Sequence, residues 1–292
     1  MPDARPILCA GAALWDVIGR ATQPLPHGAD VPGRVVRRPG GVALNVALAL
    51  AALGQPVTLL AAVGDDDAGD ALARRLTAAG VDAAGLCRYA GPTDTYVAIE
   101  DEGGELHAAV ADCAGLEAAG AAVLAPLRDG RLPAPWTGRI VADGNLPVAV
   151  LAALVDGVSD PGSLALVPAS PGKAALLAPL AAGRPLAIYV NRLEAEALCG
   201  ARFGDSRVAA AALRARGAAA AIVTDGAAAA TAATAEAVVT RVPPSVGARS
   251  VTGAGDAFVA AHLVALAAGR GPEPALAAAL EAAARHITGS PT

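Results

Sequence analysis

The most informative segment of the chain is VTGAGDAF, residues 251–258, which leads into an apolar helical pattern ending at Ala268. Glycines ahead of a helix let backbone N–H groups approach an anion closely, and the helix dipole adds positive potential there. Asp256 stands at the start of this helix, where a carboxylate can accept the proton of an attacking hydroxyl group. A plainer interpretation is that Asp256 only caps a helix after an ordinary glycine-rich turn.

Upstream of this segment, short apolar runs alternate with helical patterns. The runs, each followed by Gly, Asp, Asn or Pro, are Ile7–Ala10, Val57–Val63, Ile140–Ala142, Leu164–Val167, Ala187–Val190 and Ala220–Thr224. The helical patterns are Val42–Leu53, Ala68–Ala79, Leu193–Leu198, Ser206–Arg216, Ala257–Ala268 and Pro274–Ile287. Apolar strands that alternate with helices predict an α/β fold with a mainly parallel sheet between helical layers.

Two segments depart from this alternation. Pro32–Arg38 is short, charged and alternating, and Thr93–Asp112 reads as strand, turn and strand with Asp101–Gly104 at the turn. They predict antiparallel strands outside the main sheet, which form a small lid within about residues 13–39 and 93–112. Because there is no long linker, we expect a single domain over residues 1–292.

Composition limits the classes of partner and the compartment. The chain has 292 residues, of which 54% are hydrophobic, and a net charge of −5, so we expect no general attraction to nucleic acid or to anionic membranes. Its four cysteines show no CxxC pair or metal-site spacing, which predicts free thiols in a reducing compartment. No signal peptide or membrane span is apparent, since polar residues such as Asn45 and His262 interrupt the longest apolar stretches. We therefore expect a cytoplasmic protein.

Two further motifs follow predicted strands, at the edge where α/β folds bind ligands. Asn191 can donate to a phosphate oxygen, and Glu194 can hold a hydrated Mg²⁺ ion, although the same pair also fits a capping box at a helix start. In Thr224-Asp225-Gly226 the glycine lets a nucleotide lie close to the backbone, although an ordinary turn fits as well. Local sequence alone leaves both alternatives open.

Polar residues near the N-terminus suggest a second half of the same site. Gly40 and Gly41 precede an apolar helix in which Asn45 is the lone amide, and a buried amide needs a partner. That partner is either a substrate hydroxyl or the backbone. Asp16 follows the first strand, where it either binds two neighbouring hydroxyls of a sugar or is a solvated loop residue.

Taken together, these motifs resemble those of the ribokinase, or PfkB, family of carbohydrate and nucleoside kinases, and the resemblance covers nearly the whole chain. Gly40-Gly41 with Asn45 resembles the N-terminal signature of the family, and Thr252–Asp256 resembles its quite specific C-terminal signature. Asn191 with Glu194 matches its NxxE motif. The resemblance implies a ribokinase-like three-layer α/β/α fold with a small β lid over the acceptor.

The resemblance also implies roles for individual residues. Asp256 would be the catalytic base, and Gly253, Ala254 and Gly255 would form the anion hole for the phosphoryl group. Asn191 and Glu194 would serve the phosphates of ATP and Mg²⁺, and Thr224 and Gly226 would lie beside the nucleotide. The acceptor would be bound by Asp16, Gly40, Gly41, Asn45, Thr95 and Asp112, with a plain hairpin-end aspartate as the alternative for Asp112. Lys173, the single lysine of the chain, either contacts phosphate or is an exposed surface lysine.

Within the family, the chain resembles pseudouridine kinases most, through Asn191–Glu196, Ser250–Thr252, Ile140–Asp143 with Asn145, and Thr95-Tyr96. The implied reaction is phosphorylation of pseudouridine to its 5′-phosphate by ATP. The alternatives are another PfkB-family sugar kinase, ribokinase-like or fructokinase-like, and a non-catalytic nucleoside-binding protein on the same scaffold. A dinucleotide-dependent oxidoreductase ranks last, because no GxGxxG follows the first strand.

Three departures from the family pattern affect these expectations. Trp15 stands where many relatives carry Asn, and we expect it to pack under the lid. Val167 with Pro168 replaces a common Asp-Pro, which removes one polar contact. Ser250 replaces an acidic or amide residue, so the use of a monovalent cation such as K⁺ is left open. An exposed lid sheet can also pair with a second copy, which makes a homodimer an open possibility.

Overall fold

A computed structural model describes residues 5–246 and 252–289 of the chain. The strands of this described part are β1 (Ile7–Ala10), β2 (Leu14–Ala21), β3 (Gly33–Gly40), β4 (Val57–Gly64), β5 (Leu86–Tyr89), β6 (Thr95–Glu100), β7 (Leu106–Asp112), β8 (Ile140–Asp143), β9 (Leu164–Val167), β10 (Ala187–Asn191), β11 (Ala220–Asp225), β12 (Ala228–Ala233) and β13 (Val238–Arg241). Its α-helices are α1 (Val42–Ala52), α2 (Asp67–Ala78), α3 (Ala114–Ala119), α4 (Val148–Asp156), α5 (Pro171–Ala181), α6 (Arg192–Cys199), α7 (Ser206–Ala215), α8 (Ala254–Ala267) and α9 (Pro272–Thr288), and two 3₁₀ helices span Gly120–Leu127 and Pro161–Ser163.

The main sheet has nine strands within the described residues, in the order β13-β12-β11-β10-β9-β8-β1-β4-β5. All pairs from β5 to β11 are parallel, whereas β12 and β13 add antiparallel strands at one edge. The chain leaves β1 toward β4 on one side and leaves β8 toward β9 on the other side. The strand order therefore reverses between β1 and β8, and a crevice at the carboxyl ends of such strands is the usual ligand site of an open α/β sheet.

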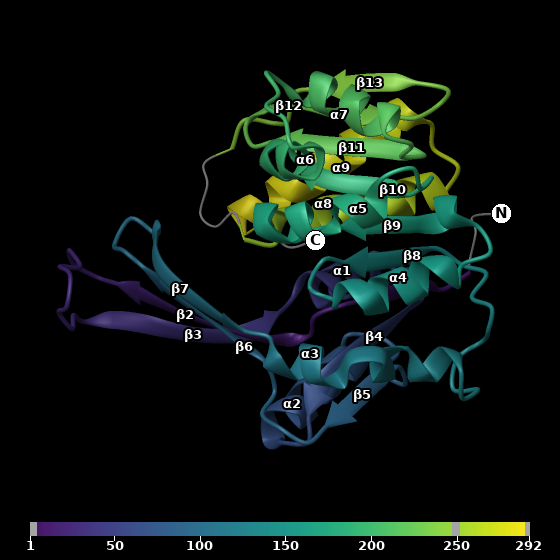
Figure 1. Cartoon of the computed structure of the whole chain (residues 1–292). Coiled ribbons are helices and arrows are strands. Elements are labelled where there is room, and N and C mark those ends of the chain that lie inside the picture. Colours follow the sequence, from purple (N-terminus) through teal and green to yellow (C-terminus); the bar gives the residue numbers. More distant parts are fainter. Residues whose placement is uncertain (1–4, 247–251, 290–292) are drawn as a thin grey trace.

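Helices cover both faces of the main sheet and make the three-layer fold expected from the sequence. One hydrophobic cluster packs α3 to α7 and the first 3₁₀ helix against the sheet, with Leu151, Leu177 and Leu213 among its members. A second cluster packs α1, α2, α8 and α9 against the other face. Figure 1 shows α5, α6 and α7 on the near side of the sheet and α8 and α9 behind it. No helix in residues 5–246 or 252–289 is long and apolar enough to cross a membrane.

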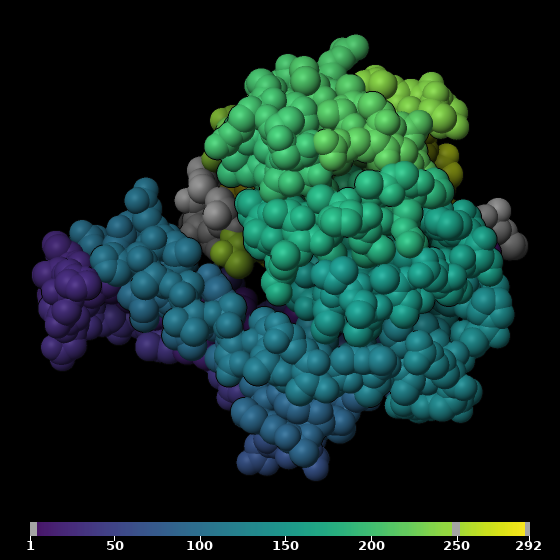
Figure 2. All heavy atoms as spheres, viewed as in Figure 1, coloured from purple at the N-terminus to yellow at the C-terminus, as the bar shows by residue number. Residues whose placement is uncertain are grey.

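A second sheet of four strands, in the order β3-β2-β6-β7, projects from the body to the left in Figure 1 and stands out from it in Figure 2. The expectation that all its strands are antiparallel is wrong for one pair, because β2 and β6 run parallel. These two strands are separated along the chain by α1, β4, α2 and β5, and a connection of that length permits a parallel pair. β2 with β3 and β6 with β7 are antiparallel, as expected.

All six predicted strands and all six predicted helices are present, with boundaries within a few residues of those expected. The glycines that follow four of the helices, Gly54, Gly80, Gly217 and Gly269, have φ between 74° and 101°, which is the left-handed conformation of a helix C-terminus. Helices α4 and α5 were not among the predicted elements. Both are rich in Ala and Leu and carry few of the polar residues that mark an amphipathic helix.

Candidate active site

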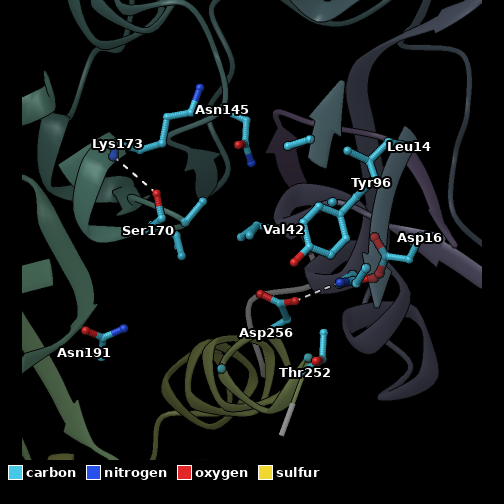
Figure 3. A pocket seen from close by; sticks show the side chains of 18 of the residues that line it. Leu14, Asp16, Val42, Tyr96, Asn145, Ser170, Lys173, Asn191, Thr252 and Asp256 are labelled. Carbon is cyan, nitrogen blue, oxygen red and sulfur yellow. Dashed lines mark hydrogen bonds between the residues drawn. The ribbon is translucent and has the colours of Figure 1, made fainter. Parts of the chain in front are cut away.

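A cavity of about 1260 Å³ lies between the carboxyl ends of the main-sheet strands, the second sheet and the start of α8. Eleven of the residues that the sequence predicted for the site line it: Asp16, Gly41, Asn45, Asp112, Lys173, Asn191, Glu194, Thr224, Gly253, Gly255 and Asp256. They come from segments throughout the chain. In Figure 3, Asp16 and Tyr96 on the second sheet face Ser170, Lys173 and Asn145 across the cavity, with Asp256 below.

Helix α8 begins directly at the cavity, and glycine is needed at its start. Gly253 is the N-cap residue, with φ 88° and no side-chain cap, so the first amides of the helix are left without a side-chain acceptor. A Cβ at Gly253 would lie 2.8 Å from Nε2 of His286 on α9. Asp256 follows in the first turn of the helix, which excludes the simple N-cap interpretation.

The carboxylate of Asp256 is held by an amide from the other half of the cavity. Nδ2 of Asn45 donates a hydrogen bond of 2.9 Å to Oδ2 of Asp256. The partner of this amide is therefore a carboxylate, and the backbone alternative for Asn45 does not apply. The contact joins α1 and α8, two helices that also pack against each other.

The surroundings of Asp256 favour a carboxyl group that titrates near neutral pH. Burial raises its pKa to about 7, and the hydrogen bond from Asn45 opposes that rise. The negative charges of Asp143, Asp16 and Glu194 add to the increase. A base of this pKa can take up a proton at pH 7 and can release it again.

Asp16 lies on β2 at the opposite wall, and Gly40 makes room for it. Asp16 is buried, which raises its pKa, and the positive charge of Arg38 opposes this at 3.7 Å. A Cβ at Gly40 would come within 2.2 Å of Oδ1 of Asp16, and a Cβ at Gly41 would meet the carbonyl oxygen of Ala12 at 2.4 Å. Gly40 does not line the cavity itself, whereas Gly41 does.

Trp15, next to Asp16, points away from the cavity. Its ring is buried, its Nε1 donates to the carbonyl of Ala68 at 3.0 Å, and the guanidinium of Arg37 lies 4.2 Å from the ring centre. The tryptophan therefore packs at the base of the second sheet, as expected, because successive side chains of a strand point to opposite faces.

Asn191 and Glu194 form the capping box that the sequence left as an alternative, and they also line the cavity. The Asn191 side chain accepts from the Glu194 amide, and Oε2 of Glu194 accepts from the Asn191 amide, each at 2.9 Å. The other carboxylate oxygen of Glu194, Oε1, has no partner among the described residues. Burial raises the pKa of Glu194.

This arrangement fits a magnesium ion that is bound mainly by water and phosphate. The described residues contain no group of three or more His, Cys, Asp or Glu side chains that could hold a metal ion. Mg²⁺ at a nucleotide usually keeps several waters and needs only one or two protein carboxylates. The unpartnered oxygen of Glu194 can supply one such contact.

Three other predicted residues lie outside the lining of the cavity: Thr95, Gly226 and Ala254. Thr95 is on the opposite face of β6 from Tyr96, and its hydroxyl donates to the carbonyl of Thr93 at 3.3 Å. Gly226 forms the turn between β11 and β12 with φ 58°. Ala254 is the first residue of α8, so only its backbone amide is available to the turn.

The structure also places residues in the cavity for which the sequence analysis proposed no role. Tyr96, Asn145, Ser170 and Tyr189 line it, and Figure 3 shows the Tyr96 side chain pointing into it. Asn145 follows the end of β8, a position that marks ligand sites in α/β sheets and was a usable signal. Val167 lines the cavity with an apolar side chain. Ser250, on which the expectation about a monovalent cation rests, lies outside the described residues, as does Val251.

Comparison with known proteins gives concordant results. A sequence model described as "pfkB family carbohydrate kinase" matches residues 4–291. The chain is 35% identical over 142 residues to "Uncharacterized sugar kinase YeiI" of Escherichia coli (strain K12), which is 48% of this chain and 38% of that protein. It is 34% identical over 107 residues to "Pseudouridine kinase" of the same organism, which is 36% of this chain and 34% of that protein.

A solved structure described as "Carbohydrate kinase from Agrobacterium tumefaciens" superposes with a TM-score of 0.79 and 28% identity, over 97% of this chain and 91% of that chain. The likeness extends over nearly the whole fold. The two curated relatives, in contrast, are matched over little more than a third of their own length.

Proposed function

Because this chain belongs to the pfkB family of carbohydrate kinases, we propose that it transfers the terminal phosphoryl group of ATP to a hydroxyl group of a sugar or nucleoside. The observation that carries the proposal is the hydrogen bond from Asn45 on α1 to Asp256 at the start of α8. The carboxylate of Asp256, whose pKa burial raises to about 7, thus lies beside a glycine turn, at the positive end of a helix and inside a large cavity.

In the proposed reaction the residues act mostly by position and charge. The acceptor hydroxyl gives its proton to Asp256 while its oxygen bonds to the terminal phosphorus, and the bond from that phosphorus to the bridging oxygen of ADP breaks. The backbone amides of Gly253, Ala254 and Gly255 hold the negative charge of the transferring group. Asp16 binds the other hydroxyls of the acceptor, and Asn45 orients the base.

On the nucleotide side, Asn191, Thr224 and Lys173 line the part of the cavity that we assign to ATP, with Gly226 in the adjoining turn. Glu194 would help to hold the hydrated Mg²⁺ ion through its unpartnered oxygen. The ion neutralises the charge of the phosphates when it is bound. Because the four cysteines are free thiols and the donor is ATP, we place the enzyme in the cytoplasm.

For the acceptor we propose pseudouridine, with the 5′-hydroxyl as the group that is phosphorylated. The partial match to a pseudouridine kinase supports this choice. The longer match to a relative named as a sugar kinase favours a second candidate, a free or phosphorylated sugar. Thr95 and Asp112 would assist acceptor binding, and Asp112 is the better placed, because it lines the cavity.

An acceptor screen tests the function directly. Purified protein is incubated with ATP and Mg²⁺ and with pseudouridine, uridine, ribose or a fructose phosphate, and the release of ADP is measured together with the mass of the product. We expect turnover with pseudouridine and a mass gain of one phosphoryl group. Turnover with a sugar and not with pseudouridine would show that the acceptor is a sugar, and the proposed kinase function would still hold. Binding of acceptors without turnover by any of them would favour a non-catalytic binding protein.

A further inference from the structure

Asp143 is a buried carboxylate that the proposed reaction does not use. It is the last residue of β8, has no exposed surface, and is not among the residues that line the cavity. It therefore does not touch a bound acceptor or nucleotide directly. A carboxylate is costly to bury unless its oxygens are well bonded, so its contacts explain why it is there.

Three backbone amides from three segments donate to Asp143. Its Oδ2 accepts from the amides of Ala12 and Ala43, at 3.0 and 2.9 Å. Its Oδ1 accepts from the amide of Asn145, at 2.9 Å. One oxygen thus joins two segments that are 31 residues apart along the chain, and the other oxygen fixes the loop after β8.

Each of these segments carries, or leads into an element that carries, a residue that lines the cavity. Ala12 leads into β2, which presents Asp16. Ala43 is in the first turn of α1, two residues ahead of Asn45, whose amide reaches Asp256. Asn145 lines the cavity itself. The carboxylate of Asp143 is therefore one hydrogen bond away from the segments that carry Asp16, Asn45 and Asn145.

The local packing leaves no substitute for this carboxylate. Helix α1 has Gly41 at its N-cap position and no side-chain cap of its own, so Asp143 supplies the oxygen that its first turn needs. A Cβ at Gly11 would lie 2.2 Å from Cγ of Asp143, so the end of β1 is shaped around the carboxylate. The contact sits where the strand order reverses, between β1 and β8.

We propose that Asp143 is a positioning residue for the acceptor half of the site: it fixes Asp16 and Asn45 relative to each other, and through Asn45 it aims Asp256. The inference rests on the proposed function for its kinetic consequence. The nucleotide half is built on α5, α6, β11 and the start of α8, none of which donates to Asp143. The structural consequence, local loosening of the acceptor segments, does not depend on what the acceptor is.

The test is Asp143→Asn, which keeps the shape of the side chain but replaces one carboxylate oxygen by an amide NH₂ group. This group cannot accept a hydrogen bond. In either orientation of the new side chain, at least one of the three backbone amides faces this NH₂ group and loses its acceptor. Because these bonds are lost, we expect the KM for the acceptor to rise roughly 10-fold or more, while the KM for ATP stays within about 2-fold. The acceptor used is the one that the wild-type protein phosphorylates fastest in the screen.

The matched control is Asp66→Asn. Asp66 also joins two segments, since it accepts from the amides of Gly69 and Thr93 at 2.8 and 3.0 Å and caps α2, but it does not line the cavity. We expect it to lower thermal stability without changing either KM. If both variants raise both KM values alike, Asp143 acts through stability alone and the proposal is overturned.

Backbone hydrogen exchange gives a readout that needs no acceptor. In Asp143→Asn we expect faster exchange in peptides that cover residues 9–16 and 42–48, and unchanged exchange in the peptide that covers α6. Local loosening supports the proposal even if no acceptor is phosphorylated, an outcome that would refute the proposed function separately. Faster exchange in all peptides of Asp143→Asn, including the one that covers α6, would overturn the proposal for Asp143.

A second variant, Asp143→Ser, is measured in the same way, because an uncharged hydroxyl can still accept one of the bonds. The test can be made as long as one of the two variants, Asp143→Asn or Asp143→Ser, folds. If neither variant folds while Asp66→Asn does, Asp143 is required for the whole fold, and the proposal of a local positioning role is overturned.

Discussion

The proposed base, Asp256, combines two features that pull its pKa in opposite directions. Burial raises the pKa to about 7, and the hydrogen bond from Asn45 lowers it. The base works only as the carboxylate, so activity should fall as the pH falls through about 7, where the group becomes protonated. We predict an acid limb of kcat/KM near that pH, and a loss of turnover of roughly 100-fold to 10,000-fold in Asp256→Asn with ATP binding retained.

Steady-state rates over a range of pH and calorimetry with an ATP analogue check this prediction. Near-normal turnover by the purified Asp256→Asn variant would assign the base to another residue.

Asn45 should set the position of that acid limb. Its amide donates to the ionised form of Asp256, so its removal in Asn45→Ala should raise the pKa of Asp256 further and move the limb to higher pH. The control is Asn145→Ala, which removes another amide from the cavity wall without a bond to Asp256. If the acid limb of kcat/KM lay at the same pH in wild type and in Asn45→Ala, the hydrogen bond from Asn45 would not affect the pKa of Asp256.

At the scale of single residues, sequence motifs predicted the chemistry but not which side chains face the cavity. Thr95 and Tyr96 are neighbours on β6, and adjacent residues of a strand point to opposite faces. The sequence favoured Thr95, whereas Tyr96 lines the cavity. The role of Asp143 was also out of reach, because its partners are backbone amides of distant segments that only the folded chain brings together.

At the scale of elements, α9 supports the start of α8. Nε2 of His286 on α9 lies 2.9 Å from the carbonyl oxygen of Thr252, next to the glycine turn. We predict that His286→Ala lowers kcat about 3-fold to 10-fold, which corresponds to one hydrogen bond of about 1 kcal/mol, and leaves the acceptor KM unchanged. His286→Gln, which keeps a donor, should restore part of the rate.

Single-turnover rates and the two KM values measure this effect. A change confined to the acceptor KM would show that α9 acts on the other half of the cavity.

Side-chain caps mark the start of several predicted helices, although Ser170 also caps α5, which was not predicted. Asp66 caps α2, Asp205 caps α7, and Asn191 with Glu194 caps α6, and each of these helices was predicted. Helix α4, in contrast, starts after Pro147 with no side-chain cap and is almost entirely apolar. Its pattern is that of any buried segment, so tertiary packing rather than local sequence defines it.

At the scale of the whole molecule, the alternation of strands and helices was sufficient to predict a parallel α/β sheet, because such strands can only be buried between two helical layers. The placement of the second sheet was not predictable to the same degree. Its four strands come from two separate parts of the chain, and the parallel pairing of β2 with β6 joins strands that are far apart in the sequence.

The projecting second sheet has two faces with different characters. One face lines the cavity, and we propose that it serves as the lid over the acceptor. The register places Val17, Val97 and Val110 in one row of the other face, with Val35 and Ile99 in the next row. Val35 and Val110 are 74% and 70% exposed, so this face presents apolar side chains to solvent. A second copy, offering the same face about a two-fold axis, would cover them.

We therefore predict that the wild-type protein is a dimer through this face and that Val110→Glu shifts it toward the monomer, because dimerisation would bury a charge without a partner. Sedimentation velocity at several concentrations measures the shift. Val208→Glu, at a valine that is 51% exposed on the surface of α7, is the control and should leave the dimer intact. Since the opposite face of the same strands lines the cavity, loss of the dimer should also raise the acceptor KM more than the KM for ATP. A wild-type protein that is monomeric at every concentration would leave the apolar face without its proposed partner.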